Sequence, residues 1–375
     1  MKFCKKCVMP DTRPGIQFDE EGVCLPCRHA EQKKTIDWKK RWEELKTLCD
    51  KHRRKTPGEY DCLIAVSGGK DSYYQVHVMK EEMNMNPLLI TVEDLFTPTE
   101  AAQHNIKNLT RTYRCNLLAF KPNPVIGKKI CRYTFEKYGR PSWYFDRLLY
   151  TVPLHYAYIL KLPLLVYGEN VSFEYGGLDK TENYSARELV FNGVAPEINL
   201  EELKKLGISD EELIYLKAPT RQQLDQLDPM YVSYFTPWND FEHYEFAKTR
   251  GFKDLSNEWD RSNYIDNFSH VDSYGFVLGS WCKYPKFGQA FATDFASRMV
   301  RNGMITREEA VKLVEAKDHN IDRRIIEDFC KFADMTPEEF YAALEKLYNK
   351  EIFYKNELGQ WRLKPELIEA RRKGK

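Results

Sequence analysis

The chain has 375 residues, of which 42% are hydrophobic and 30% charged, a composition typical of a folded globular protein. Its length predicts two domains or one large domain with appendages. The net charge of +1 argues against a nucleic-acid partner, and no apolar run reaches the roughly 18 residues that predict a membrane span. The N-terminus lacks an apolar signal segment, which predicts a cytoplasmic protein whose cysteines stay reduced.

Residues 1–35 are expected to form a small metal-binding module. Two Cys-x-x-Cys pairs have the spacing of a zinc ribbon, and the predicted ligands are Cys4, Cys7, Cys24 and Cys27. Four protein ligands leave Zn²⁺ no open position, which predicts a structural role. An iron–sulfur cluster or a redox pair would use the same thiols and stays an alternative. The other six cysteines are scattered singly and are interpreted as core residues.

An α/β pattern occupies the second predicted unit, residues 36–240, after an amphipathic helix at 36–55. Apolar runs predict strands at 61–66, 87–92, 116–120 and 162–167, and helices are expected at 71–84, 99–112 and 145–161. Strands that alternate with helices predict a doubly wound parallel sheet, with ligands at the carboxyl ends of the strands. Residues 231–238 are either an edge strand or a substrate loop. The third unit, 241–375, is expected to be mainly helical, with capping boxes at Thr306 and Thr336.

A glycine-rich turn follows the first predicted strand and precedes a helix. This is the context of a phosphate-binding loop, in which backbone N–H groups and the helix N-terminus face an anion. The turn is neither a Walker A loop nor a dinucleotide-binding turn, because both of those spacings are missing. Asp71 is expected to hold Mg²⁺, to cap the helix, or both. The loop consists of Ser67, Gly68, Gly69, Lys70, Asp71 and Ser72.

Two further segments carry candidate binding residues. Gly168 and Glu169 follow the fourth predicted strand, where a carboxylate would lie near the loop; a solvated loop carboxylate is the alternative for Glu169. Lys286 belongs to a Lys-Tyr-Pro-Lys-Phe-Gly segment beginning at residue 283. Arg298 and Arg301 would share one helix face, either as anion ligands or as a plain basic surface.

The loop resembles the pyrophosphate loop of the N-type ATP pyrophosphatases, the PP-loop ATPases of the adenine nucleotide alpha-hydrolase-like fold. That resemblance implies ATP and Mg²⁺ as cofactors, attack at the α-phosphate and release of pyrophosphate. It implies catalytic roles for Lys70 and Asp71 and nucleotide binding by the rest of the loop. An acidic residue at the position of Glu169 can bind Mg²⁺ in that superfamily, and we expect Gly168 and Lys286 to line the same site.

Nearly the whole chain is similar to the N-acetyl sugar amidotransferases, within which the pseudaminic acid biosynthesis branch is nearest. The similarity lies in the cysteine segments, the SGGKDS loop, the Tyr-Gly-Glu-Asn turn and the late Lys-Phe-Gly and Thr-Arg-Glu-Glu-Ala segments. It implies an ATP-dependent transferase that adenylylates the carbonyl oxygen of an N-acetyl group on a nonulosonic acid or related sugar. Ammonia then displaces AMP to give an acetamidino sugar of the kind used in flagellin glycosylation.

The ammonia source is expected to lie outside the chain. Cys4 is not N-terminal and no Gly-x-Cys-x-Gly elbow is present, so a separate glutaminase subunit or free ammonia is implied. One alternative is a tRNA-thiolating PP-loop enzyme, which also joins zinc-binding cysteines to such a loop. The absence of further paired cysteines and of a basic surplus weighs against it. Another alternative is a regulatory protein that binds a nucleotide without turnover.

Overall fold

A five-stranded parallel sheet forms the centre of the protein. The computed structural model describes residues 1–177, 183–191 and 193–374. The strand order is β3-β2-β1-β4-β5. All four predicted strands are present, each within two residues of its expected ends, and a fifth lies at the edge. The strands are β1 (Cys62–Ala65), β2 (Pro87–Val92), β3 (Leu117–Phe120), β4 (Leu164–Tyr167) and β5 (Asp228–Tyr231).

The strand order changes direction at β1. From β1 the chain moves outward through β2 to β3, then returns to place β4 on the other side of β1. In this register Ile64 of β1 lies between Leu89 of β2 and Val166 of β4. In open parallel sheets ligands bind at the carboxyl ends of strands where the order reverses. Ser67 and Gly168 follow β1 and β4 at that edge.

Helices pack against the sheet and against one another. α6 (Trp143–Ile159) contacts β1, β2 and β4, while α3 (Lys70–His77) contacts α4 (Glu100–Tyr113) and α11 (Asp240–Thr249). Every residue of β4 is buried, as is typical of a parallel strand with both faces covered.

The structure differs from the sequence prediction in three elements. The helix expected at 71–84 ends at His77 and continues as one π-helical turn over Val78–Glu82. Helix α5 (Pro124–Tyr138) was not predicted. Residues 231–238 begin at the end of β5 and continue as α10 (Val232–Phe235). The sequence of β5 did not predict a strand because it contains Pro229, which lacks an N–H. The structure tolerates this proline because β5 lies at the edge of the sheet.

The other elements are mostly helical. Thr306 and Thr336 form the two predicted capping boxes. The remaining helices and strands are α1 (Leu25–Lys33), α2 (Trp38–His52), α7 (Val171–Tyr175), α8 (Leu200–Lys204), α9 (Arg221–Leu224), α12 (Val277–Trp281), α13 (Lys283–Phe287), α14 (Phe291–Arg301), α15 (Arg307–Lys317), α16 (Arg323–Ala333), α17 (Pro337–Glu345), β6 (Phe353–Lys355), β7 (Trp361–Leu363) and α18 (Pro365–Lys373), with short 3₁₀ turns at Leu189–Phe191 and Ile214–Leu216.

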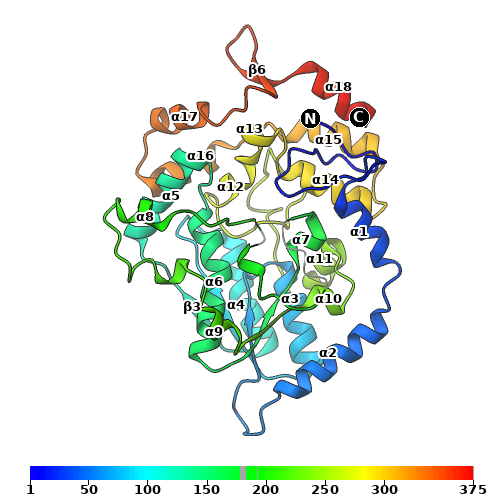
Figure 1. The fold of residues 1–375 in the computed structure, drawn as a ribbon, viewed down its shortest axis with the longest axis vertical. Helices are drawn as coiled ribbons and strands as arrows, with labels where there is room; N and C mark the ends of the chain where they lie inside the picture. Colours follow the sequence, from blue (N-terminus) through cyan, green and yellow to red (C-terminus); the bar gives the residue numbers. More distant parts are fainter. Residues whose placement is uncertain (178–182, 192, 375) are drawn as a thin grey trace.

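One large hydrophobic core runs from Leu45 in α2 to Leu344 in α17, while the four N-terminal cysteines form a small core of their own. The N-terminal segment lies beside α14 and α15, close to the C-terminal helix α18 (Figure 1). Arg307 attaches α15 to the N-terminal segment, because its side chain donates hydrogen bonds to the carbonyls of Cys4 and Cys7. Among the described residues, no helix has the length and apolar character needed to cross a bilayer.

Candidate active site

The Ser67–Ser72 loop turns tightly between β1 and α3. Gly68 has φ +85°, and a Cβ there would lie 3.3 Å from the backbone nitrogen of Ile106, so the position requires glycine. The N–H groups of Ser67 and Gly68 donate to the Ser72 hydroxyl at 3.0 and 3.2 Å, and that of Gly69 donates to the Ser67 hydroxyl at 3.2 Å. These three N–H groups were expected to face an anion; here the serine hydroxyls hold them. The first N–H groups of α3 still lack intrahelical acceptors.

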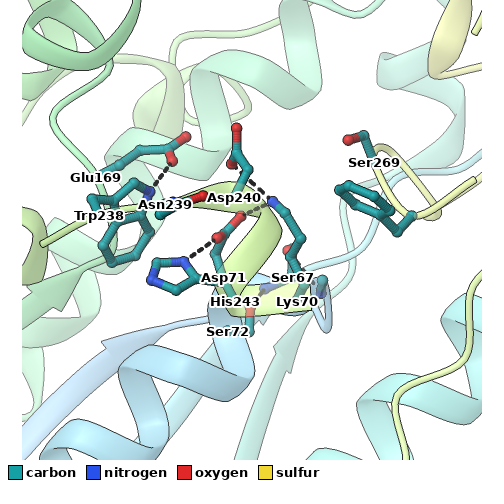
Figure 2. A network of polar contacts seen from close by, with 12 residues as sticks. Ser67, Lys70, Asp71, Ser72, Glu169, Trp238, Asn239, Asp240, His243 and Ser269 are labelled. Carbon is teal, nitrogen blue, oxygen red and sulfur yellow. Dashed lines mark hydrogen bonds and ion pairs between the residues drawn. The ribbon is translucent and has the colours of Figure 1, made fainter. Parts of the chain in front are cut away.

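Lys70 forms a buried ion-pair network beside the loop (Figure 2). Its side chain is 7% exposed, and its Nζ donates to Asp71 Oδ2 at 2.6 Å and to Asp240 Oδ1 at 3.0 Å. The other oxygen of Asp240 accepts from Arg298. Burial favours a neutral lysine, but Asp240 and Asp71 outweigh it and raise the pKa of Lys70. The ammonium is therefore held charged, and its charge is shared between two carboxylates.

Asp71 faces this network and does not cap α3. Gly69 occupies the N-cap position without a side-chain hydrogen bond. Asp71 Oδ1 lies 2.8 Å from Nδ1 of His243, a buried residue of α11 whose ring stacks on Tyr74 at a centroid distance of 4.0 Å. Burial acts to raise the pKa of Asp71, but Lys70 and His243 outweigh it and lower the pKa.

Glu169 approaches from β4. One of its oxygens accepts from Trp238 Nε1 at 2.8 Å and from the Tyr175 hydroxyl at 2.9 Å. A Cβ at Gly168 would lie 2.9 Å from the Trp238 ring, so glycine is needed for this close approach. Burial, together with repulsion from Asp71 and Asp240, raises the pKa of Glu169 to about 8. Glu169 is thus a partly buried site carboxyl and not a solvated loop residue.

Three carboxylates meet beside the loop. Asp71, Glu169 and Asp240 each place an oxygen within 4.8 Å of the others. Mg²⁺ prefers carboxylate oxygens and is commonly held by one or two of them together with phosphate oxygens. The donor set therefore fits Mg²⁺. A bound Mg²⁺ would offset the repulsion among these carboxylates, which already raises the pKa of Glu169.

A cavity of about 1080 Å³ opens at this edge of the sheet. On one side it is lined by Ser67, Thr91 and Glu169, which follow or end sheet strands. On the other side it is lined by residues from the C-terminal part of the chain, among them Lys283 and Arg298. One cavity therefore joins the loop to residues more than 200 positions later.

Lys286 also lines this cavity, but its Nζ donates to the carbonyls of Gly139 at 2.7 Å and Tyr138 at 3.3 Å, at the end of α5. Arg298 and Arg301 lie on α14 as predicted, yet they meet different neighbours. Arg298 pairs with Asp240. The thiols of Cys7, Cys27 and Cys24 act against burial to raise the pKa of Arg301, so this residue belongs to the cysteine module.

The four N-terminal cysteines are brought together as predicted. Their sulfur atoms lie within 4.8 Å of one another, with 3.6 Å between Cys7 and Cys24 and 4.0 Å between Cys4 and Cys27. Zn–S bonds of about 2.3 Å in a tetrahedron require sulfur separations of about 3.8 Å, so the group can hold a single metal ion such as zinc. Backbone N–H groups of Cys7 and Cys24 donate to the Cys4 sulfur, as expected for a thiolate ligand.

Sequence reasoning missed three residues of the site: Trp238, Asp240 and His243. Trp238 lay inside a segment considered as a substrate loop, while Asp240 and His243 had no local motif. Asn239 caps α11, so Asp240 occupies the first turn of that helix, where an acidic residue is ordinary. Only the packing of α11 on α3 brings them to Lys70 and Asp71.

Comparison with known proteins relates the C-terminal part of the chain to a described protein family. Residues 261–367 match the family described as "LPS biosynthesis protein WbpG-like, C-terminal domain". This segment contains α12 to α17, and it supplies Lys283 and Arg298 to the cavity.

A curated relative extends the similarity over most of the chain. An uncharacterized protein of Methanocaldococcus jannaschii is 22% identical over 325 residues, which cover 83% of this chain and 92% of that protein. The expected likeness to sugar-biosynthesis proteins is supported for the C-terminal part. The finer likeness to N-acetyl sugar amidotransferases and their pseudaminic acid branch stays a prediction.

Proposed function

We propose that this chain is an ATP-dependent amidotransferase that converts the N-acetyl group of a sugar into an acetamidino group. The observation that carries the proposal is the cluster of Asp71, Glu169 and Asp240 beside the Ser67–Ser72 loop. Ser67 and Glu169 line a cavity that residues of the WbpG-like segment also line. The loop and carboxylates suit ATP with Mg²⁺, and the WbpG-like segment fits a role in sugar biosynthesis. The doubly wound PP-loop fold belongs to this proposal and agrees with the strand order around β1.

In the proposed reaction the carbonyl oxygen of the acetamido group attacks the α-phosphorus of ATP, and pyrophosphate leaves. Ammonia then adds to the activated carbon, and AMP departs with the former carbonyl oxygen, which leaves a C=N bond in its place. An amide oxygen is a poor leaving group, and conversion to a phosphate ester corrects this. Mg²⁺ bound by the carboxylates would supply charge stabilisation on the phosphates.

The residues of the chain have distinct tasks in this scheme. Lys70 offers a fixed positive charge, while Asp240 holds both Lys70 and Arg298 in place. His243 and Trp238 orient Asp71 and Glu169 through one hydrogen bond each. Such positioning and electrostatic stabilisation supply most of the rate enhancement in phosphoryl-group chemistry. We further propose a separate glutaminase, or free ammonia, as the nitrogen source.

The rival tRNA-thiolating function gains no support. Apart from Cys4, Cys7, Cys24 and Cys27, no three cysteines among the described residues lie within 4.8 Å of one another, and the other six are free and buried.

The test is pyrophosphate release by the purified protein with ATP, Mg²⁺, ammonia and candidate N-acetylated sugars, with tRNA in parallel. We expect sugar-dependent release and a product about one mass unit lighter than the sugar, because oxygen is replaced by NH. Release that depends on tRNA, or none with any acceptor, would refute the proposal.

A further inference from the structure

The cavity carries a cluster of positive side chains away from the loop. Arg140 follows α5, and Lys283 and Lys286 lie one turn apart on α13; all three line the cavity. The Lys286 ammonium lies 2.7 Å from the carbonyl of Gly139, the residue before Arg140. The cluster therefore combines the end of α5 with the WbpG-like segment.

Two members of this cluster have no carboxylate partner among the described residues. Arg140 donates from Nη1 to the carbonyl of Val194 at 3.2 Å, and Lys286 donates to two carbonyls; neither forms an ion pair within 4 Å there. Charged groups that leave bulk water are normally paired. Burial, followed for Lys286 by repulsion from Arg140 and Lys283, lowers the pKa of Lys286 to about 8. An anion in the cavity would relieve that cost.

The nearby carboxylates do not neutralise the cluster. Asp294 is shared between Lys283 at 3.1 Å and Arg13, and Asp146 accepts from the Ser142 hydroxyl. With Arg13 this end of the cavity thus has four cations against two carboxylates. Gln289 adds an acceptor for a hydroxyl of the ligand, not for its anionic group: it is 1% exposed, lines the cavity and has a buried Oε1 without a hydrogen-bond partner.

We propose that Arg140, Lys283 and Lys286 bind an anionic group of the substrate, a carboxylate or a phosphate carried by the sugar. That the ligand is a sugar rests on the proposed function; that it is anionic rests on the unpaired cations. Two ion pairs of α14 lie between the cluster and the loop: Asp294 pairs with Lys283, and Arg298, four residues further along the helix, pairs with Asp240. An anion at the cluster would leave the rest of the sugar extending toward the loop.

Lys286 also has a structural task, because it bonds the last carbonyls of α5 as cations at helix C-termini commonly do. Those two bonds use two of its three ammonium hydrogens. Arg140 uses one guanidinium nitrogen for Val194. Both residues keep donors for a ligand in the cavity.

The test measures binding in the absence of turnover. The probes form two matched pairs: N-acetylneuraminic acid with its methyl ester, and UDP-N-acetylglucosamine with N-acetylglucosamine. In isothermal titration calorimetry we expect at least one charged probe to bind about tenfold or more tightly than its uncharged partner. The pair that shows the difference identifies carboxylate or phosphate. Repeating the titrations in excess of a non-hydrolysable ATP analogue excludes binding at the loop.

Variants assign the preference to the cluster. Arg140→Gln and Lys286→Met should each reduce the charged-to-uncharged ratio at least about fivefold, whereas Lys286→Arg should retain it. Lys121→Met is the matched control, since Lys121 lines the same cavity but is 73% exposed and paired with Glu93. Circular dichroism confirms that each variant is folded.

Equal binding of charged and uncharged probes, binding of none, or a preference that survives when Arg140→Gln and Lys286→Met are combined in one chain would overturn the anion site. Because no ATP is consumed, a charge preference without pyrophosphate release would leave the anion site standing while the proposed reaction fails.

Discussion

Two groups of side chains lie close enough together to hold a metal, and the chain assembles them differently. The four cysteines come from the first 27 residues and enclose a small core of their own. The three carboxylates come from α3, the end of β4 and α11, and His243 beside them lies 172 residues after Asp71. The first group depends on local chain geometry and the second on the whole sheet and its helices.

The groups also differ in how their negative charge is balanced. Lys70 and Arg298 form ion pairs with the carboxylates, so that group has its own counter-charges. The thiols have Arg301 near them but no ion pair of that kind among the described residues. From this comparison we expect the cysteine module to need a metal in order to fold, and the carboxylate group to fold without one.

The largest expected effect concerns the cysteine module. Cys24→Ser should lower bound zinc from about one ion per chain to nearly none and reduce the free energy of unfolding by about 4 kcal/mol or more, because the module folds around its metal. Metal analysis by mass spectrometry and thermal unfolding measure the two effects. Cys330→Ser is the control, since Cys330 is a lone buried thiol of α16. Zinc retained by Cys24→Ser would remove the distinction between the two groups.

The second effect concerns the internal counter-charges of the carboxylate group. Asp240→Asn leaves Lys70 and Arg298 without their shared partner, so we expect a loss of about 3 kcal/mol in unfolding free energy and about 100-fold in pyrophosphate release. Chemical denaturation and the release assay test both. Glu245→Gln changes an exposed carboxylate of the same helix and should alter neither. Full activity in Asp240→Asn would show that the network is only structural.

The same contrast explains what the sequence could predict. The cysteine ligands, the loop and the first four strands were predictable, because each depends on spacing or periodicity within a short segment. Asp240 and His243 were not, because their role arises from the packing of α11 on α3 across 170 residues. Nor were the hydroxyl bonds of Ser67 and Ser72 to the loop N–H groups, which depend on the detailed turn. Nor were the bonds of Lys286 to the carbonyls at the end of α5, and its expected contact with a nucleotide stays a prediction.

A smaller effect should follow from removing the hydrogen bond that orients Glu169 while its carboxylate is kept. Trp238→Phe deletes the N–H that orients Glu169 but keeps an aromatic ring against Gly168. We expect the Mg²⁺ concentration for half-maximal pyrophosphate release to rise about fivefold, because one hydrogen bond contributes about 1 kcal/mol. Trp361→Phe is a matched control, because Trp361 lies on the β6–β7 hairpin and its N–H donates to Glu345 at the end of α17. An equal response in both variants would exclude a positioning role for Trp238.

The last expected effect concerns stability and not activity, and it comes from a cavity carboxyl without a counter-charge. Asp94 accepts from the Ser273 hydroxyl and from the Phe96 N–H, and no cation lies within 4 Å among the described residues. Burial, with repulsion from Asp272 and Asp328, raises its pKa to about 7. The folded protein therefore binds more protons than the unfolded chain between about pH 4 and pH 7, and its free energy of unfolding falls as pH rises through that window.

Asp94→Asn should remove this slope. Chemical denaturation at several pH values should show the wild type losing about 1 to 2 kcal/mol more than the variant between pH 5 and pH 8. Glu93→Gln, which alters an exposed carboxylate paired with Lys121, should keep the wild-type slope. Parallel slopes in all three proteins would mean that Asp94 is ionised at little cost. In that case, a neighbouring cation would not explain why the carboxylates beside the loop differ from the other carboxylates of the cavity.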